Sequence, residues 1–473
     1  MPVQQSRLAP TNSLSTQATK VRPRWVALLT LCLGVLVAQL DTSVVNLAAR
    51  PIGADFHAGV GPLQWVLDSY NLFYAVLLLT GGLLADLYGR RRIFMIGTGI
   101  FTAASLLCAL APTMMILIGG RALAGIGAAL LLPASLAIIR VLWSDENERG
   151  RALGIWAACN GLALAIGPTI GGFLITHFGW RSIFLIVLPA GMAALVLAAL
   201  AIPESADPSD RHFDAGAQIL GVAVLGGFAV AAIESHRAIG LSVLAFLIAL
   251  AALPLFIKLE AKRGRPALVP LDIFRIPAFC GAITATTGMT FGMYGVLFLL
   301  PLTWQSTGLL DAAAAGIALM PMALVYVFVS PLSGVLAARL GARVMTAGGV
   351  AIIGMGLLVI GFGAQCASIT PAEIGLGLTG LGMGLATGPL MAVAVGAVVG
   401  ARSGTAAALI NVARMSGATI GVAILGAIFA TVQSGPAGLR LAMFLGGIVQ
   451  LTGAAIAWIT TRQPPAAGAS GMA

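Results

Sequence analysis

The segment that decides the fold is Gly82-Leu83-Leu84-Ala85-Asp86-Leu87-Tyr88-Gly89-Arg90-Arg91-Arg92, a short charged turn between two very apolar runs. A second stretch, from Gly334 to Arg343, repeats its G-x-L-A-x-x-x-G-x-R pattern about 250 residues later. An internal repeat in an apolar chain predicts a membrane protein built from two related helical bundles. Secondary transporters are the leading example of that architecture.

The composition points to the same class of protein. Hydrophobic residues make up 59% of the chain, charged residues only 9%, and the mean hydropathy is +1.01. A soluble domain carries about 25% charged residues. The 60 glycines suit close packing of helices in lipid. The chain is therefore expected to lie in a lipid bilayer.

Several kinds of chemistry lack their usual signatures. The nucleotide-binding signature G-x-x-x-x-G-K-[ST], which an ATP-driven pump needs, does not occur. The five cysteines and four histidines are scattered and suggest neither a disulfide framework nor a metal site. We expect no enzyme activity, no metal and no cofactor. No cleavable signal peptide is evident, because the first apolar run, from Trp25, is long enough to span a bilayer.

A bilayer core about 30 Å thick needs about 20 apolar residues per helix. The predicted spans lie near residues 25–48, 62–85, 93–111, 114–140, 151–175, 181–202, 214–233, 238–257, 278–303, 313–337, 344–364, 372–398, 404–428 and 438–461. With the N-terminus inside, inner segments hold 20 of the 26 Lys and Arg residues and outer loops hold four. That bias predicts fourteen spans with both termini in the cytoplasm. The net charge of +10 is then a signal for membrane orientation, and we expect no nucleic-acid partner.

The repeat also predicts how the spans are grouped. The two copies of the motif follow spans 2 and 10, an offset of eight, whereas two six-span bundles alone would give six. A second echo agrees, because Gly167 to Gly171 in span 5 matches Gly417 to Gly421 in span 13. Spans 7 and 8 are therefore an inserted pair. The expected parts are an N-terminal tail, a first bundle, the inserted pair with its flanking loops, a second bundle and a C-terminal tail, at residues 1–24, 25–202, 203–277, 278–461 and 462–473.

Four motifs resemble those of a known family, the major facilitator superfamily, and within it the fourteen-span drug:proton antiporters. They are Leu40 to Asn46 in span 1, Gly82 to Arg92 with Trp65 to Tyr70 before it, Arg121 to Gly127 in span 4, and Gly167 to Gly172 in span 5. The resemblance covers about residues 25–461. The chain departs from the family pattern after Asn46, where Arg50 stands before Pro51 in place of an apolar residue.

This resemblance implies a proton-coupled antiporter that exports hydrophobic, cationic or amphiphilic drugs by alternating access. The implied partners are a small-molecule substrate, protons and the lipid of a bacterial plasma membrane, with the monomer as the functional unit. The proton gradient would supply the energy. A proton-coupled importer of a nutrient and a non-transporting membrane sensor are the alternatives. The antiporter-type motif in span 5 argues against the importer, and the lack of a soluble signalling domain argues against the sensor.

Buried charges lead to similar residues without the family. A charge inside a membrane helix costs several kcal/mol and needs a role or a partner. At 1.5 Å per residue, Asp41 lies about 24 Å from the inner face, and Asp68 and Arg121 lie about 9 and 10 Å from the outer face. Burial disfavours the charged carboxylate and a nearby arginine favours it. Asp41, Asp68 and Arg121 are therefore the candidate proton-coupling residues, with at least one carboxylate near Arg121.

Structural readings of the same charges stay open. Either aspartate can be a fixed partner of Arg121 that never titrates, and Arg121 can be a scaffold counter-ion. Polar residues at helical spacing predict a shared water-filled cavity in the first bundle. Arg414, in span 13, either faces that cavity or bonds backbone carbonyls. The candidate cavity-lining residues are Gln39, Thr42, Asn46, Gln64, Asn71 and Arg414.

Two further sites follow from the motifs. The antiporter motif, with Gly167, Pro168, Gly171 and Gly172, predicts a bent and tightly packed span, although an ordinary kinked helix is the alternative. The inner gate is expected at Asp86, Gly89, Arg90 and Arg149. The family places the matching aspartate against the start of span 13, near Ser403, Gly404 and Thr405 here. The second copy has Ala338 in place of Asp86, so the latch should be one-sided.

Overall fold

The computed structural model describes residues 24–207, 214–236, 238–263, 269, 271–366, 368–398, 403–432 and 435–461. All regular elements in these residues are helices. The α-helices are α1 (Arg24–Asp55), α2 (Val60–Tyr88), α3 (Arg90–Ala109), α4 (Met114–Leu142), α5 (Glu146–Phe178), α6 (Ser182–Leu185), α7 (Val187–Ala201), α8 (Ala215–Ile233), α9 (Ile239–Arg263), α10 (Pro277–Ser306), α11 (Ala312–Ala318), α12 (Met320–Val329), α13 (Ser333–Leu340), α14 (Ala342–Gly363), α15 (Thr370–Gly396), α16 (Ser403–Thr431) and α17 (Pro436–Thr460). Three 3₁₀ segments join them, η1 (Glu234–His236), η2 (Leu271–Arg275) and η3 (Ser330–Leu332).

Local signals start these helices. The side chains of Thr113, Asp145, Asp214 and Asp311 each cap the helix that follows by accepting a hydrogen bond from a backbone N–H of its first turn. The two copies of the repeated motif end their helices in the same way, because Gly89 and Gly341 adopt positive φ angles of 106° and 87°. A side chain with a Cβ is strained in that conformation, so both turns require glycine.

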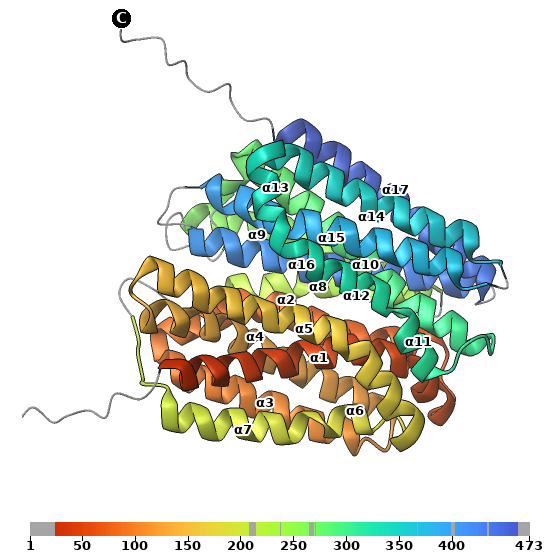
Figure 1. The fold of residues 1–473 in the computed structure, drawn as a ribbon, viewed down its shortest axis with the longest axis horizontal. Helices are drawn as coiled ribbons and strands as arrows, with labels where there is room; N and C mark the ends of the chain where they lie inside the picture. The colour runs from red at the N-terminus through yellow and green to blue at the C-terminus, as the bar shows by residue number, and fades with distance from the viewer. Residues whose placement is uncertain are drawn as a thin grey trace, which may run out of the picture.

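The helices form two bundles with matching neighbours (Figure 1). In the first bundle α4 packs on α2 and α3, and α1 packs on α5 and α7. In the second bundle α15 packs on α12 and α14, and α10 packs on α16 and α17. The corresponding helices meet in both bundles, as expected of a structural repeat. The pair α8 and α9 packs together, and α8 also contacts α2 of the first bundle and α16 of the second.

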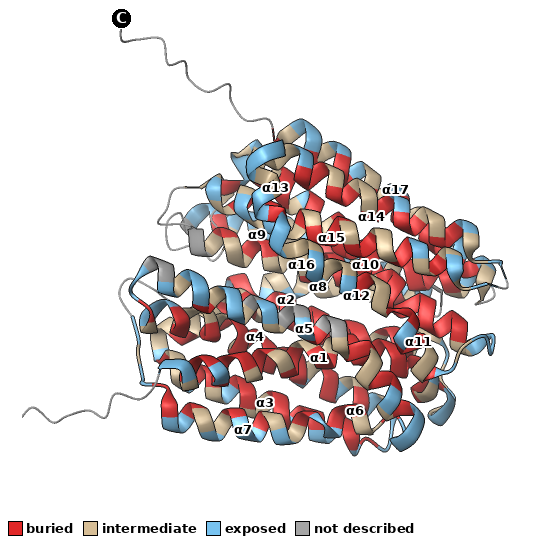
Figure 2. Cartoon of the chain, in the orientation of Figure 1, coloured by how far each residue is buried: buried red, intermediate tan, exposed pale blue. Residues whose placement is uncertain are grey.

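Thirteen stretches of the described residues are long and apolar enough to cross a membrane. They include α6 with α7, counted as one stretch, and α11 to α13, counted as another. The helix α5, with 33 residues, is not among them. Figure 2 shows exposed residues along the outer faces of the bundles. Many of these are large apolar side chains, such as Leu244 and Leu247 on α9, which is typical of a surface in contact with lipid.

The bundles meet along two seams and also where α1 packs on α10, at which Gln305 donates a hydrogen bond to the carbonyl of Leu47. One seam lies between α2 and α16, and the other lies between α5 and the α11–α12 segment. Both ends of the described chain lie on one side of the molecule, which we call the terminal face; the opposite side is the distal face (Figure 1). At the terminal face, the start of α1 approaches α5 through an Arg24–Glu148 ion pair of 3.6 Å. At the distal face, Arg181 pairs with Asp55 at 2.8 Å and donates to the carbonyl of Ala111.

Candidate functional site

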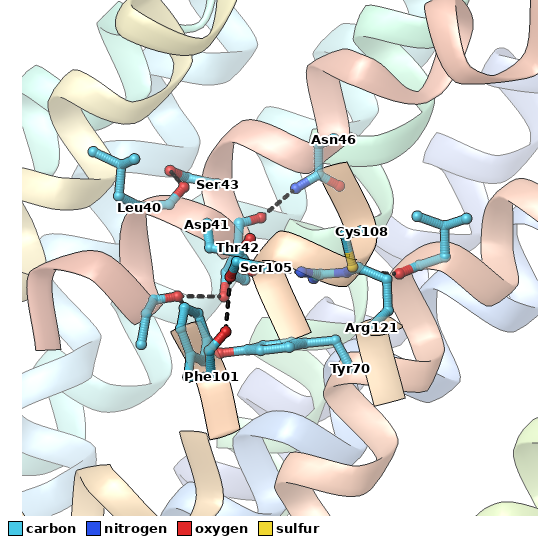
Figure 3. A network of polar contacts seen from close by, with 12 residues as sticks. Leu40, Asp41, Thr42, Ser43, Asn46, Tyr70, Phe101, Ser105, Cys108 and Arg121 are labelled. Carbon is cyan, nitrogen blue, oxygen red and sulfur yellow. Dashed lines mark hydrogen bonds and ion pairs between the residues drawn. The ribbon is translucent and has the colours of Figure 1, made fainter. Parts of the chain in front are cut away.

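A buried ion pair lies at the centre of the first bundle. Arg121 Nη1 on α4 lies 2.5 Å from Asp41 Oδ2 on α1, and each side chain is only 1% exposed. Figure 3 shows the two side chains pointing toward each other between their helices. The expectation that a carboxylate lies beside Arg121 is confirmed for Asp41. Removing one partner of a buried pair leaves an uncompensated charge, so each residue depends on the other.

Arg121 also holds α2 in place. Its Nε donates a hydrogen bond of 3.1 Å to the carbonyl of Val66. Its guanidinium stacks over the Tyr70 ring, 4.6 Å from the ring centroid, and the Tyr70 hydroxyl lies 3.5 Å from the carbonyl of Ala38 on α1. One arginine thus joins α1, α2 and α4. The Tyr70 contact is not predictable from spacing, because it depends on the rotation of α2 about its own axis.

Asp68 lies on α2, two residues from the Val66 carbonyl that Arg121 binds. Its side chain is fully buried, and neither carboxylate oxygen has a hydrogen-bond partner among the described residues. Asp41 uses Oδ2 for Arg121, while its Oδ1 also lacks a partner there. A buried carboxylate without hydrogen bonds is costly when it is charged. The site therefore combines one paired and one unpaired carboxyl group, an arrangement in which a proton can be gained or lost without dismantling the ion pair.

The candidate cavity-lining residues of α1 and α2 lie around this pair. Thr42 is half-buried and donates to the carbonyl of Ala38, and Asn46 donates to the carbonyl of Thr42. Gln39 is half-buried, and Asn71 is buried with its Oδ1 lacking a partner among the described residues. Their role in a cavity stays a prediction.

Gln64 crosses the α2–α16 seam. Its Nε2 donates bonds of 2.9 Å to the carbonyls of Val422 and Ala423 on α16. Gly426 lies against the same amide, so a Cβ there would collide with Gln64. In this state Gln64 ties the bundles together close to the distal face. Gln64 shares one face of α2 with Asp68 and Asn71, but this spacing does not predict the contact with α16. A sequence does not show which helix packs against that face.

Arg414 lies on α16 at the junction of the bundles. It is half-buried, and its Nε has no hydrogen-bond partner among the described residues. Its guanidinium interacts electrostatically with the hydroxyls of Tyr74 on α2 and Tyr294 on α10. The two tyrosines therefore place Arg414 between the bundles. Neither tyrosine was singled out from the sequence, since an aromatic residue in an apolar helix carries no specific signal.

The antiporter motif packs between the two bundles. A Cβ on Gly167 would collide with the Ser43 side chain of α1, and a Cβ on Gly171 would collide with that of Val44. Gly172 faces the backbone of Ala312 on α11, and Gly316 on α11 approaches the carbonyl of Pro168 as closely. These contacts close the second seam in its distal half. Glycine is required here because the helix backbones touch.

The terminal-face loop is held by charges. Asp86 pairs with Arg90 at 2.8 Å across the Gly89 turn, and Arg149 lies half-buried in the first turn of α5. The side chain of Ser403 and the surroundings of Gly404 lie outside the described part of the chain. Glu204 is a residue that the sequence did not reveal. Its carboxylate accepts bonds of 3.0 and 3.1 Å from the backbone N–H groups of Arg91 and Arg92 at the start of α3, where an anion is favoured.

Comparisons with known proteins identify relatives of the chain. The sequence profile described as Major Facilitator Superfamily matches residues 31–422. The chain is 35% identical to multidrug resistance protein Stp of Mycobacterium tuberculosis (strain CDC 1551 / Oshkosh), over 86% of the chain and 76% of that protein. It is 34% identical to the methylenomycin A resistance protein of Bacillus subtilis (strain 168), over 95% and 97% of the two chains. It is 32% identical to multidrug efflux pump LfrA of Mycolicibacterium smegmatis, over 88% and 82%.

The fold also matches solved structures. A bacterial homolog of the human lysosomal transporter Spinster, in its inward-facing and occupied conformation, superposes with a TM-score of 0.66. The sequences are 17% identical, and the match covers 94% of this chain and 99% of that one. At this identity the likeness concerns the fold alone.

Proposed function

The chain belongs to the major facilitator superfamily, and from that premise we propose that it is a proton-coupled antiporter that exports hydrophobic, cationic or amphiphilic drugs. Membership indicates a multi-pass membrane transporter rather than an enzyme. The relatives named above are drug resistance and efflux proteins at 32–35% identity, which supports drug export here. The bacterial plasma membrane is the proposed location, with both termini in the cytoplasm.

The buried carboxylates carry the proposal. Asp41 and Arg121 form a neutralised pair, and Asp68 lies on the neighbouring helix with no hydrogen bond among the described residues. In this state a charged Asp68 would be buried without solvation. The state is therefore more stable when Asp68 is protonated and neutral. When the bundles separate and water reaches the carboxyl group, the proton can leave. Proton exchange is thereby tied to the change of shape that alternating access requires.

The architecture that fits this function has fourteen spans. We propose that α5 is the fourteenth, because its 33 residues extend about 50 Å at 1.5 Å per residue and it packs along α1 inside the first bundle. Residues 25–202 and 278–461 then form the two bundles, related by a pseudo-two-fold axis, with spans 7 and 8 outside that symmetry. The terminal face, which carries most of the basic residues, is cytoplasmic.

Alternating access would proceed between two closures. The contacts of Gln64 with α16 and of Gly172 with α11 join the distal ends of the bundles, so this is the state closed to the outside. In the opposite state we propose that Asp86 binds the N-terminus of α16 near Thr405 and closes the cytoplasmic side. A helix N-terminus stabilises a carboxylate by about 0.3–1 kcal/mol, or more when partly buried. Arg90, already paired with Asp86, would complete that latch, and Arg149 is its second candidate cation.

Everted membrane vesicles test the proposal. With an imposed acidic interior, the protein should accumulate a fluorescent lipophilic cation in the vesicles, and a protonophore should release it. Vesicles without the protein are the control. A nutrient importer would move its substrate the other way, and a membrane sensor would move none. Absence of accumulation with a panel of lipophilic cations and neutral antibiotics would contradict proton-coupled drug export.

A further inference from the structure

The inserted helix α8 is anchored to α2 along most of its length. Near the terminal face, Gln218 hydrogen-bonds to Thr80 and donates a bond of 2.6 Å to the carbonyl of Val76. Gln218 and Thr80 are both buried. Near the distal face, Trp65 Nε1 donates a bond of 2.9 Å to Glu234 Oε1, directly after α8. Two polar attachments thus flank the helix.

Apolar packing and the connecting linker add to this attachment. Between the two polar contacts, Leu72 and Val76 of α2 form a buried cluster with Ala229 of α8. The linker that leads toward α8 is joined to the α2–α3 turn by two backbone bonds of 2.8 Å, from Arg90 to Ser205 and from Asp207 to Asp86. Breaking a buried hydrogen bond leaves unsatisfied polar groups and costs about 1–3 kcal/mol. The helix α8 is therefore expected to stay with α2 when the bundles move.

The attached helix α8 also covers the junction between the two bundles. Besides α2, α8 packs on α16, so it lies across the seam at which the two bundles meet. Figure 1 shows α8 behind the junction of the bundles, whereas α5 and α12 face the viewer. The two seams thus differ, although the bundles repeat each other. No other described helix lies in front of α5 and α12 in this view, and both carry exposed residues there (Figure 2).

We propose that α8 and α9 form a wall, fixed to the first bundle, that shields the α2–α16 seam from lipid. A substrate dissolved in the bilayer therefore reaches the transporter through the α5–α12 seam. This inference rests on the proposed drug export, because a hydrophobic compound concentrates in the membrane before transport. The helices α8 and α9 would thus determine through which of the two seams the substrate enters.

Spin-label distances test the attachment without relying on transport. In a protein with its five native cysteines replaced by alanine, labels are placed at three lipid-exposed positions: Ile219 on α8, Leu107 on α3 and Met355 on α14. Distances are compared between Gln64→Leu and Asp86→Asn backgrounds, which weaken the outer and the inner closure respectively.

The expected result is an unchanged distance between positions 219 and 107, while the 219–355 and 107–355 distances shift together. A constant 219–355 distance with a changing 219–107 distance would show that α8 follows the second bundle and would overturn the wall. A 107–355 distance that never changes would instead contradict the alternating access of the proposed function.

Blocking one seam at a time tests the route. Phe328→Cys on α12 and Ile219→Cys on α8 are matched, since the native side chains are 73% and 67% exposed. Both are reacted with a bulky, lipid-soluble maleimide. Modification at position 328 should slow uptake of a lipophilic cation several-fold in everted vesicles, whereas modification at position 219 should leave the rate unchanged. Slower uptake after modification at position 219 alone, at both positions or at neither would contradict the proposed entry route. An unmodified protein that takes up no cation would contradict the proposed function.

Discussion

At the scale of single residues, one arginine organises the candidate proton site. Arg121 binds Asp41, the Val66 carbonyl and the Tyr70 ring, so its charge is shared among three helices. Asp68 lies beside this arrangement without a hydrogen bond among the described residues. The two aspartates therefore differ in what they do for the fold, and substitutions should separate the structural role from the coupling role.

Asp68→Asn should leave the fold intact and abolish transport driven by a pH gradient. Asparagine is nearly isosteric and uncharged, so it imitates a protonated Asp68 that cannot release its proton. We expect a thermal midpoint within a few degrees of the wild type and exchange of substrate without a gradient. Ser69→Ala, at the next position of α2, removes a buried hydroxyl without a hydrogen-bond partner among the described residues and is the control that should retain coupling. Wild-type coupling in Asp68→Asn would place the proton site elsewhere.

Asp41→Asn should instead destabilise the protein, because it leaves Arg121 buried and unpaired. Breaking a buried ion pair from one side costs about 3–5 kcal/mol. Thermal unfolding of Asp41→Asn, Arg121→Gln and the double variant forms a cycle. The double variant should lose clearly less stability than the two single losses added together. Additive losses would mean that the pair contributes no coupling energy to the fold.

At the scale of helices, different residues make the contacts at the distal face and at the terminal face. The distal face is joined through Gln64 on α2, which binds two carbonyls of α16, and through the glycine contacts between α5 and α11. On the terminal face, Asp86 pairs with Arg90 within its own loop, which Glu204 fixes by binding the start of α3. Closure of one face and opening of the other therefore depend on separate side chains that can be altered independently.

Gln64→Leu and Asp86→Asn should shift the conformational balance in opposite directions. Gln64→Leu removes two bonds to α16, each worth about 0.5–1.5 kcal/mol, and should favour the outward-open state by roughly 5-fold or more. Asp86→Asn weakens the inner latch and should favour the inward-open state. Labelling of cysteines introduced on each face measures both populations. An identical labelling pattern in the two variants would exclude separate latches.

At the scale of the whole molecule, residue counts along the predicted helices give the depth of each side chain in the membrane. They do not give the rotation of each helix about its axis, which decides which side chains meet. The apolar runs predicted an all-helical membrane protein and the common depth of Asp41, Asp68 and Arg121. Depth alone could not tell which carboxylate pairs with Arg121, since that depends on how three helices turn about their axes. The first predicted span ends near residue 48, whereas α1 continues through Pro51 to Asp55.

Contacts between distant segments were beyond sequence reasoning for the same reason. Glu204 caps α3 from a loop 112 and 113 positions away from its two donors, and its only signal was an acidic residue in a polar linker. Two predicted spans are interrupted in the structure, at Ile186 between α6 and α7 and around Leu319 and Ser330 between α11 and α13. Each break lies within three residues of a proline, Pro189, Pro321 or Pro331, and a proline removes a backbone donor and bends or interrupts a helix.

Purified protein in liposomes tests proton coupling most directly. With no pH gradient and no other energy source, an outward gradient of a lipophilic cation should drive protons into the liposomes, and an internal dye should report acidification. Asp68→Asn should abolish the pH change, and Ser69→Ala should retain it. Substrate flux without proton movement, or acidification in Asp68→Asn equal to that of the wild type, would contradict proton-coupled export through this site.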